Sequence, residues 1–260
     1  MILNRSKLLA GAFLIGITGF AHSAPMWSVS AEGTTGAINA EAAFLASLSV
    51  SRTENFESGY VVGNQSETID TALNGNVGSF TMTTWTEKTN GACNSTKNGY
   101  TYNCKDGLAV LDAHASPFGG RYSMPEGPVG GGKWLDSMDA EVLTYTLATG
   151  FNAVGFYITD ANDINALLDV NVYVNDSFEL NIANIIQSAK KGGASDGEVY
   201  YISIWDNESD ISSLVFVNNG NNDGFGLDNV TIGRVPEPGT LALLGLGIAG
   251  LVGARRRQQA

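Results

Sequence analysis

Short segments in which apolar and polar residues alternate recur along most of the chain, and they constrain the fold more than any other feature. The stretch SFTMTTW alternates from Phe80 through Met82, and EVLTYTLA places Leu143, Tyr145 and Leu147 on one face. The alternation continues in GFYITD, LLDVNVYVND, SFELNIA, EVYYISIWDN and SSLVFVNNG. Since successive side chains of a strand point to opposite faces of a sheet, we predict an all-β fold.

Runs of turn-forming residues, among them TDANDIN, KKGGASDG and NNGNNDG, separate these segments. Many short strands joined by such turns favour two packed sheets, and we predict a jelly-roll-like β-sandwich. An apolar fraction of 43% is ample for a core, so the 32 glycines indicate tight turns rather than disorder.

One helix is predicted before the strands begin. In AINAEAAFLASLSV, the residues Ile38, Ala42, Leu45 and Leu48 recur at helical spacing. This spacing predicts a short amphipathic helix with these four side chains on its buried face.

The N-terminus has the organisation of a secretory signal peptide. Arg5 and Lys7 precede an apolar run from Leu8 to Phe20, and the small residues of AHSAP follow it. This run is shorter than the roughly 17 to 25 apolar residues of a membrane span. We therefore predict a cleaved signal peptide over residues 1–24 and a folded body over residues 25–234.

The C-terminal segment, residues 235–260, has three parts in order. The motif VPEPGT comes first, an apolar stretch from Leu241 to Ala254 follows, and a cluster of three arginines comes next, at Arg255, Arg256 and Arg257. The prolines keep the chain extended, the apolar stretch forms a hydrophobic helix that holds the membrane weakly, and the arginines stay on the cytoplasmic side.

This arrangement resembles the PEP-CTERM sorting signal of Gram-negative bacteria. The resemblance implies export across the inner membrane, transient anchoring there, and processing by an exosortase that recognises the motif Val235, Pro236, Glu237 and Pro238. It also implies a final location on the outer surface or in the extracellular matrix. An ordinary C-terminal membrane anchor is the alternative.

The charge of the body argues against nucleic acid as a partner. Without both terminal segments the chain keeps 9 basic and 25 acidic residues, a net charge of about −16. Phosphate backbones bind proteins through lysine and arginine, so an acidic body repels them. Such a surface also suits solubility and divalent cations.

The two cysteines, Cys93 and Cys104, lie in one short segment of a chain bound for an oxidising compartment. We predict a local disulfide between them, because no second cysteine pair and no nearby histidine offers a metal site. The disulfide closes a hairpin rich in glycine and asparagine.

A calcium site is predicted from a second, more diffuse resemblance. The segment FGLDNVTIGRV, at residues 225–235, resembles the last strand of many exported proteins with such a tail, and NFESG, at residues 55–59, resembles the opening strand of jelly rolls of the carbohydrate-binding-module type. That resemblance implies a structural calcium held by Glu57 and Asp228. The run NNGNNDG adds Asp223 as a candidate ligand, although an ordinary β-turn explains that run better. No other cofactor is required.

A Gly/Pro-rich loop over residues 116–139 interrupts the rhythm of strands. It contains Tyr122 and Trp134, which are candidates for stacking on a glycan, together with Trp85 and Trp205 elsewhere. Packing of these side chains onto the sandwich is the alternative, and we favour packing for the loop.

Strings that resemble catalytic motifs lack their structural context. GASDG, at residues 193–197, precedes a strand instead of following one, and GPVGGGK, at residues 127–133, is followed by Trp134 where a phosphate loop needs Ser or Thr. One histidine remains in the body, His114, near Asp112 and Ser116. Carboxylate pairs such as Asp136 with Asp139, or Glu54 with Glu57, are expected by chance in so acidic a chain.

We therefore predict an exported surface or matrix protein with a noncatalytic body and extracellular polysaccharide as its candidate ligand. A secreted hydrolase that acts on polysaccharide is the alternative, and it requires two acids in a cleft beside an aromatic platform.

Overall fold

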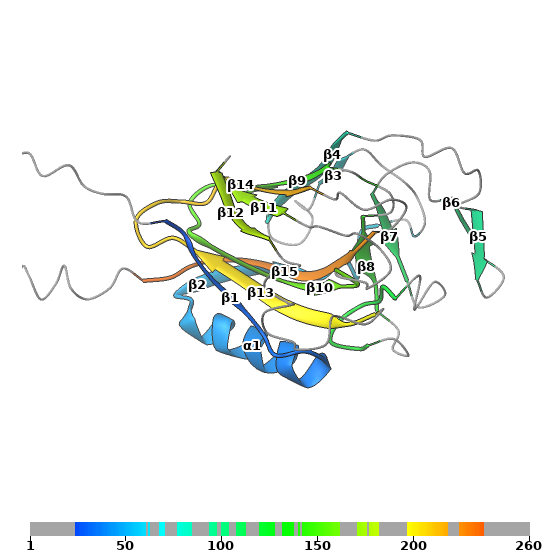
Figure 1. Cartoon of the computed structure of the whole chain (residues 1–260), viewed down its shortest axis with the longest axis horizontal. Helices are drawn as coiled ribbons and strands as arrows, with labels where there is room; N and C mark the ends of the chain where they lie inside the picture. Colours follow the sequence, from blue (N-terminus) through cyan, green and yellow to red (C-terminus); the bar gives the residue numbers. More distant parts are fainter. Residues whose placement is uncertain are drawn as a thin grey trace, which may run out of the picture.

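The computed structural model describes fifteen stretches of the chain. They are 24–60, 62, 68–70, 77–84, 94–97, 100–103, 108–112, 120–127, 132–137, 140, 142–161, 171–175, 177–181, 197–217 and 224–236. Within them the chain is almost entirely β, with one helix, α1 (Thr34–Ser47), as Figure 1 shows.

The larger sheet contains seven strands, all paired antiparallel. Its order is β1-β13-β10-β15-β8-β7, and β2 also pairs with β15. The strands are β1 (Met26–Val29), β2 (Val50–Glu54), β7 (Ala109–Leu111), β8 (Trp134–Asp136), β10 (Ala153–Thr159), β13 (Val199–Trp205) and β15 (Gly226–Arg234).

The second sheet contains six strands in the order β12-β11-β14-β9-β4-β3, and a separate hairpin joins β5 to β6. These strands are β3 (Thr68–Asp70), β4 (Gly78–Thr84), β5 (Asn94–Lys97), β6 (Tyr100–Asn103), β9 (Val142–Leu147), β11 (Asn171–Val174), β12 (Ser177–Asn181) and β14 (Ser213–Val217).

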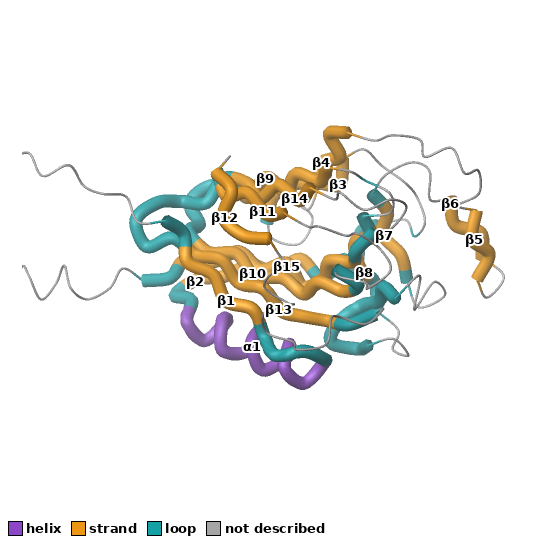
Figure 2. The backbone as a smooth tube through the Cα atoms, in the orientation of Figure 1, coloured by secondary structure: helices purple, strands orange, loops and turns teal. Residues whose placement is uncertain are grey.

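The two sheets face each other across one apolar core, so the predicted sandwich is present (Figure 2). Phe156 of the larger sheet meets Phe216 of the second sheet edge to face, with ring centroids 5.5 Å apart. The chain also passes repeatedly between the sheets. The orders β2-β15-β10-β13 in one sheet and β9-β14-β11-β12 in the other show these crossings, and the jelly-roll arrangement stays a prediction.

The alternation in the sequence sets which side chains enter this core. In β9, Leu143, Tyr145 and Leu147 are buried, and the residues between them are more exposed, as predicted. In β10, by contrast, every residue is buried. Both faces of β10 are covered, one by the second sheet and the other by α1.

Helix α1 packs on the outer face of the larger sheet, below it in Figure 1. The helix was predicted, but its buried face was not: Ala37 and Phe44 are buried, whereas Ile38 and Leu45 are 36% and 38% exposed. The reason lies in the sheet. Gly155 has no side chain, and a Cβ there would lie 2.7 Å from the ring of Phe44, so the sheet accepts that ring at this position.

The loop predicted over residues 116–139 is partly strand, because Trp134–Asp136 forms β8 and pairs with both β7 and β15. Its described residues pack against the body, and Arg121, Tyr122 and Met124 are buried. Packing was the favoured alternative for this segment.

Several predictions fall outside the described residues. They are the signal peptide up to Ser23, both cysteines, Asp223, and the sorting tail from Glu237 onward. Among the described residues, no helix has the length and apolarity that crossing a membrane requires. The hairpin of β5 and β6 lies between the two cysteines, and Asn94 pairs with Asn103 at its open end.

Candidate functional site

The end of the folded body, where the tail begins, is held from both sides. Strand β15 pairs with β2 up to its last residue, with Arg234 opposite Val50, and with β10, where Gly233 lies opposite Ala153. The side chain of Leu48, just after α1, lies directly over Gly233, where a Cβ would come within 2.4 Å of it. Strand β15 therefore stays in the sheet until the tail leaves.

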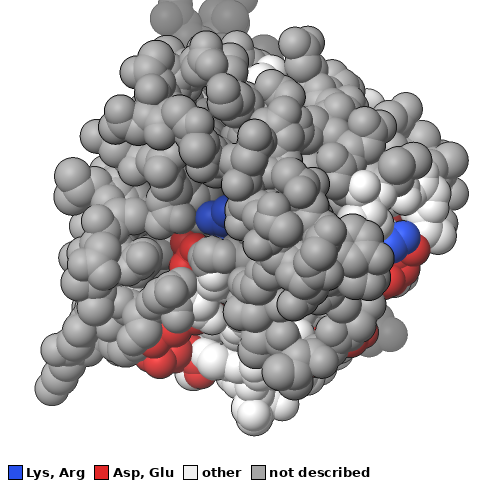
Figure 3. All heavy atoms as spheres, turned by 90° about the vertical axis from the view of Figure 1, so that its right-hand side faces the viewer, with Lys and Arg blue, Asp and Glu red and all other residues white. Residues whose placement is uncertain are grey.

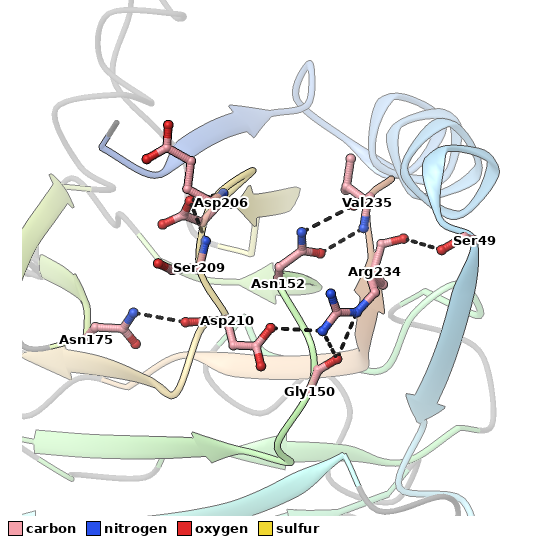
Figure 4. A network of polar contacts seen from close by, with 10 residues as sticks. Ser49, Gly150, Asn152, Asn175, Asp206, Ser209, Asp210, Arg234 and Val235 are labelled. Atoms are coloured by element: carbon pink, nitrogen blue, oxygen red, sulfur yellow. Dashed lines mark hydrogen bonds and ion pairs between the residues drawn. The ribbon is translucent and has the colours of Figure 1, made fainter. Parts of the chain in front are cut away.

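Two further side chains form hydrogen bonds with the backbone at the end of the strand and just after it (Figure 4). The Oδ1 atom of Asn152 accepts a hydrogen bond from the N–H of Val235 at 2.8 Å, and its Nδ2 donates to the carbonyl of Val235 at 3.2 Å. Ser49 donates to the carbonyl of Arg234 from its hydroxyl, at 3.0 Å, and from its backbone N–H, at 2.9 Å. We call this set of contacts to Arg234 and Val235 the junction clamp.

The side chain of Arg234 ties the junction to two loops. Its Nε and Nη2 atoms donate to the carbonyl of Gly150 at 3.2 and 2.9 Å, and Nη2 forms an ion pair with Asp210 at 3.0 Å. Both charged side chains are about half exposed, so this pair contributes little stability. Its effect is to orient the loop that follows β13.

That loop is itself ordered by polar contacts, as Figure 4 shows. The carboxylate of Asp206 accepts hydrogen bonds from the N–H groups of Glu208 and Ser209. Asn175, after β11, donates to the carbonyl of Asp210 and accepts from Ser212. The junction is thus braced by both sheets.

Val235 is the last residue of the junction clamp, and Pro236, where the described part of the chain ends, is exposed. Val235 is half-buried against the apolar cluster between α1 and the sheet. Beside it lies an apolar groove of about 360 Å³, whose walls include Phe44, Tyr201 and Trp205.

A second, polar pocket lies on the other side of α1 and measures about 580 Å³. Glu41 of α1, Asn55, Glu57 and Asn229 line it. Glu41 accepts hydrogen bonds from Asn229 at 3.1 Å and from the hydroxyl of Tyr157 at 2.6 Å. The pocket is therefore organised by a carboxylate of the helix.

The candidate calcium ligand Asp228 is almost completely buried, at 2% exposure. Its Oδ2 accepts from the N–H of Met124 and its Oδ1 from the N–H of Asn229, both at 2.7 Å. Burial raises the pKa of Asp228 well above its ordinary value; these two N–H groups oppose the rise, and the charges of Glu126 and Glu57 add to it.

The other candidate ligand, Glu57, accepts a hydrogen bond from the backbone N–H of Lys133 at 2.7 Å, and the ammonium of Lys133 donates to the carbonyl of Glu57 at 2.9 Å. The carboxylates of Glu57 and Glu126 lie near the buried carboxylate of Asp228, and carboxylate oxygens are the donors that a hard cation such as calcium takes. However, the described residues contain no group of three or more His, Cys, Asp or Glu side chains placed to hold a metal ion. The calcium site stays a prediction.

Two of the candidate stacking residues, Tyr122 and Trp134, are not surface platforms. Trp134 is fully buried, and its Nε1 donates to Asp136 at 3.1 Å. Tyr122 is 6% exposed, its hydroxyl donates to the carbonyl of Gly197, and burial raises its pKa to about 12, with further contributions from Asp160 and Glu198. These rings pack the loop onto the sandwich, so the prediction that they stack on a glycan is wrong. Trp205 is half-buried in the apolar groove, and Trp85 is outside the described residues.

The role of Arg121 was not anticipated from the sequence. Its buried guanidinium forms an ion pair with Asp136 at 2.9 Å and approaches Asp160 at 3.8 Å. Asp160 in turn accepts from the N–H of Gly197. An arginine within a Gly/Pro-rich run gives no local signal of such burial.

Of the acidic pairs considered for catalysis, only Glu54 with Glu57 is described in full, and these two side chains do not line one pocket. Glu54 is fully buried and accepts from the N–H of Phe56 at 2.7 Å, whereas Glu57 lines the polar pocket. Asp136 is occupied by Arg121 and Trp134. Asp139, His114 and Ser116 are outside the described residues.

Comparison with known proteins bears on the junction directly. Residues 234–257 match the family description of the PEP-CTERM protein-sorting motif. The chain carries a PEP-CTERM sorting motif. This motif implies export and recognition by an exosortase-type processing enzyme.

The match to the PEP-CTERM motif begins at Arg234, the last residue of β15. No curated protein matches the chain significantly. Among solved structures, the chain is similar to the K2 cleaved adhesin domain of Lys-gingipain, with 15% sequence identity and a TM-score of 0.35. That similarity covers 71% of this chain and 98% of the other.

Proposed function

We propose that the chain is an exported, noncatalytic surface or matrix protein, which its tail holds at the inner membrane until an exosortase-type enzyme acts at the motif Pro236–Glu237–Pro238. One observation carries the proposal: the sorting motif begins at the last residues that the junction clamp holds, and its first proline is exposed.

A processing enzyme needs an extended substrate that stands clear of the folded body. The junction clamp fixes the chain through Val235, and the proline that follows cannot donate a backbone hydrogen bond to continue the sheet. Folding of the body is therefore complete where the processing segment starts, and release does not require any strand to unfold.

The burial and the bonding of the acidic and aromatic side chains support the noncatalytic part of the proposal. The buried carboxylates Asp136 and Glu54 are bound to neighbouring groups. Among the described residues, no aromatic side chain lines the polar pocket between α1 and β15. We do not assign glycan contacts to Tyr122 or Trp134, because their rings are buried.

Replacement of the motif tests this proposal. In cells that contain an exosortase, Glu237→Ala combined with Pro238→Ala is expected to leave the tail-bearing form in the membrane fraction. The matched control is Glu208→Ala, which changes an exposed acid in the loop beside the junction and leaves the motif intact. Equal release of the doubly substituted chain and the control, measured by fractionation and intact mass, contradicts processing at this motif.

A further inference from the structure

We propose that the end of the body from which the tail leaves docks directly on the lipid bilayer, in addition to being tethered to it. This end, the tail end, is formed by the start of β1, the last turn of α1, the start of β2 and the end of β15. The inference rests on the proposed function, since it requires that the apolar stretch Leu241–Ala254 enters the membrane before processing.

The tether is short. Between Val235, which the junction clamp holds, and Leu241, where the apolar stretch begins, lie five residues. An extended chain advances at most about 3.6 Å per residue, so these residues reach roughly 20 Å. While the tail is inserted, the tail end must therefore face the bilayer at close range.

Exposed apolar side chains gather at this end. Among the described residues, the exposed large hydrophobic side chains are Met26, Trp27, Ile38, Leu45 and Val50, with exposures of 36% to 50%. Four of them, Met26, Trp27, Leu45 and Val50, lie in the start of β1, the last turn of α1 and the start of β2, whereas Ile38 lies in the first half of α1.

Strand pairing places Val50, the most exposed of these side chains, beside the tail. Val50 is directly opposite Arg234. Met26 is opposite Trp205, which packs in the same apolar cluster as Val235. Figures 1 and 2 show that β1 starts and β15 ends at the same end of the sandwich, at the left of the view.

The surface between these side chains is also apolar. The groove with Phe44, Tyr201 and Trp205 in its walls opens there, and Val235 contributes to its lining. Trp27, at 43% exposure, has the amphipathic ring that favours the boundary between lipid headgroups and acyl chains. Arg52, exposed on β2 two residues after Val50, adds a positive charge to this end, and its guanidinium carbon lies 5.2 Å from the centroid of the Phe151 ring.

Charge does not distinguish the tail end from the opposite end of the body. At the opposite end, the described charged side chains that are visible in Figure 3 are mostly acidic. The tail end also carries acids, since Glu208 and Asp210 are exposed in the loop beside the junction. The tether and the exposed apolar side chains therefore set the direction of docking, and net charge does not.

Quenching by brominated lipids tests the docking. The full chain is reconstituted into phosphatidylethanolamine/phosphatidylglycerol vesicles with or without bromine on the acyl chains, and the emission of Trp27 is taken as the difference between the wild type and Trp27→Phe. We expect bromine to reduce this emission about twofold or more. The control carries Trp27→Phe together with Glu126→Trp, which moves the indole to the opposite end, where bromine is expected to have no effect.

The outcomes separate docking from anchoring. Flotation with the vesicles reports insertion of the tail: a chain that does not float contradicts the proposed anchoring itself. A chain that floats but shows equal Trp27 emission in both lipids overturns the docking alone. Unquenched Trp27 with cross-linking between copies at this face, or with loss of processing in Trp27→Asp, likewise overturns lipid docking and assigns the face to a second copy or to the processing enzyme.

Discussion

Removal of the Asn152 side chain is the sharpest test of the junction clamp. The side chain is buried, at 5% exposure, and both of its hydrogen bonds go to the backbone of Val235. A hydrogen bond contributes about 0.5–1.5 kcal/mol net, and Val235 is only half-buried, so water can replace part of the loss. We therefore expect Asn152→Ala to lower the free energy of unfolding by about 1–2 kcal/mol.

For a body of this size, 1 kcal/mol shifts Tm by roughly 2–4 °C, so Asn152→Ala is expected to melt about 3–6 °C below the wild type. Thermal unfolding of the exported protein, followed by circular dichroism, measures this shift. The matched control is Asn55→Ala, an exposed asparagine whose side chain accepts one long hydrogen bond from Glu57 at 3.3 Å. Identical melting of the two variants refutes the clamp as a stabilising element.

Three further predictions concern the body. Arg121→Ala leaves two buried carboxylates without their partner and is expected to cost about 3–5 kcal/mol in urea denaturation, whereas a loss below about 1 kcal/mol contradicts the buried ion pairs. Because the pKa of Asp228 is raised in the folded state, its contribution is complete below the ordinary carboxyl pKa and is lost as the pH rises through the raised value. In chelator, stability should therefore fall as the pH rises above the ordinary carboxyl pKa of about 4, less so in Asp228→Asn, and added calcium should restore it if Glu57 and Asp228 hold the ion. Cys93 and Cys104 are expected to give no free thiol in the exported, unreduced protein, and two reactive thiols would rule out the disulfide.

The sequence by itself determined the strands and the tail. The period of two in residues such as Leu143, Tyr145 and Leu147 is a local property, because a strand exposes alternate side chains whatever it pairs with. The sorting motif is equally local, since an enzyme reads it as an extended segment. The existence of α1 was also predictable from spacing over a few turns.

Only the tertiary structure decided which surfaces meet. The buried face of α1 depends on Gly155, which lies on a strand more than a hundred residues away and admits the ring of Phe44. Trp134 became a core residue instead of a glycan platform because β8 pairs with β15. No spacing rule predicts such contacts, since they join residues that are distant in the chain.

At the junction between body and tail, the sequence and the tertiary structure again determined different features. The sequence located the start of the tail at Val235. The structure added Ser49 and Asn152, which precede the junction by 185 and 83 residues and hold its backbone, and it placed Trp27 and Val50 at the same end. Strand pairing over long separations brings these residues together, because burial of the shared core fixes the register of every strand at once.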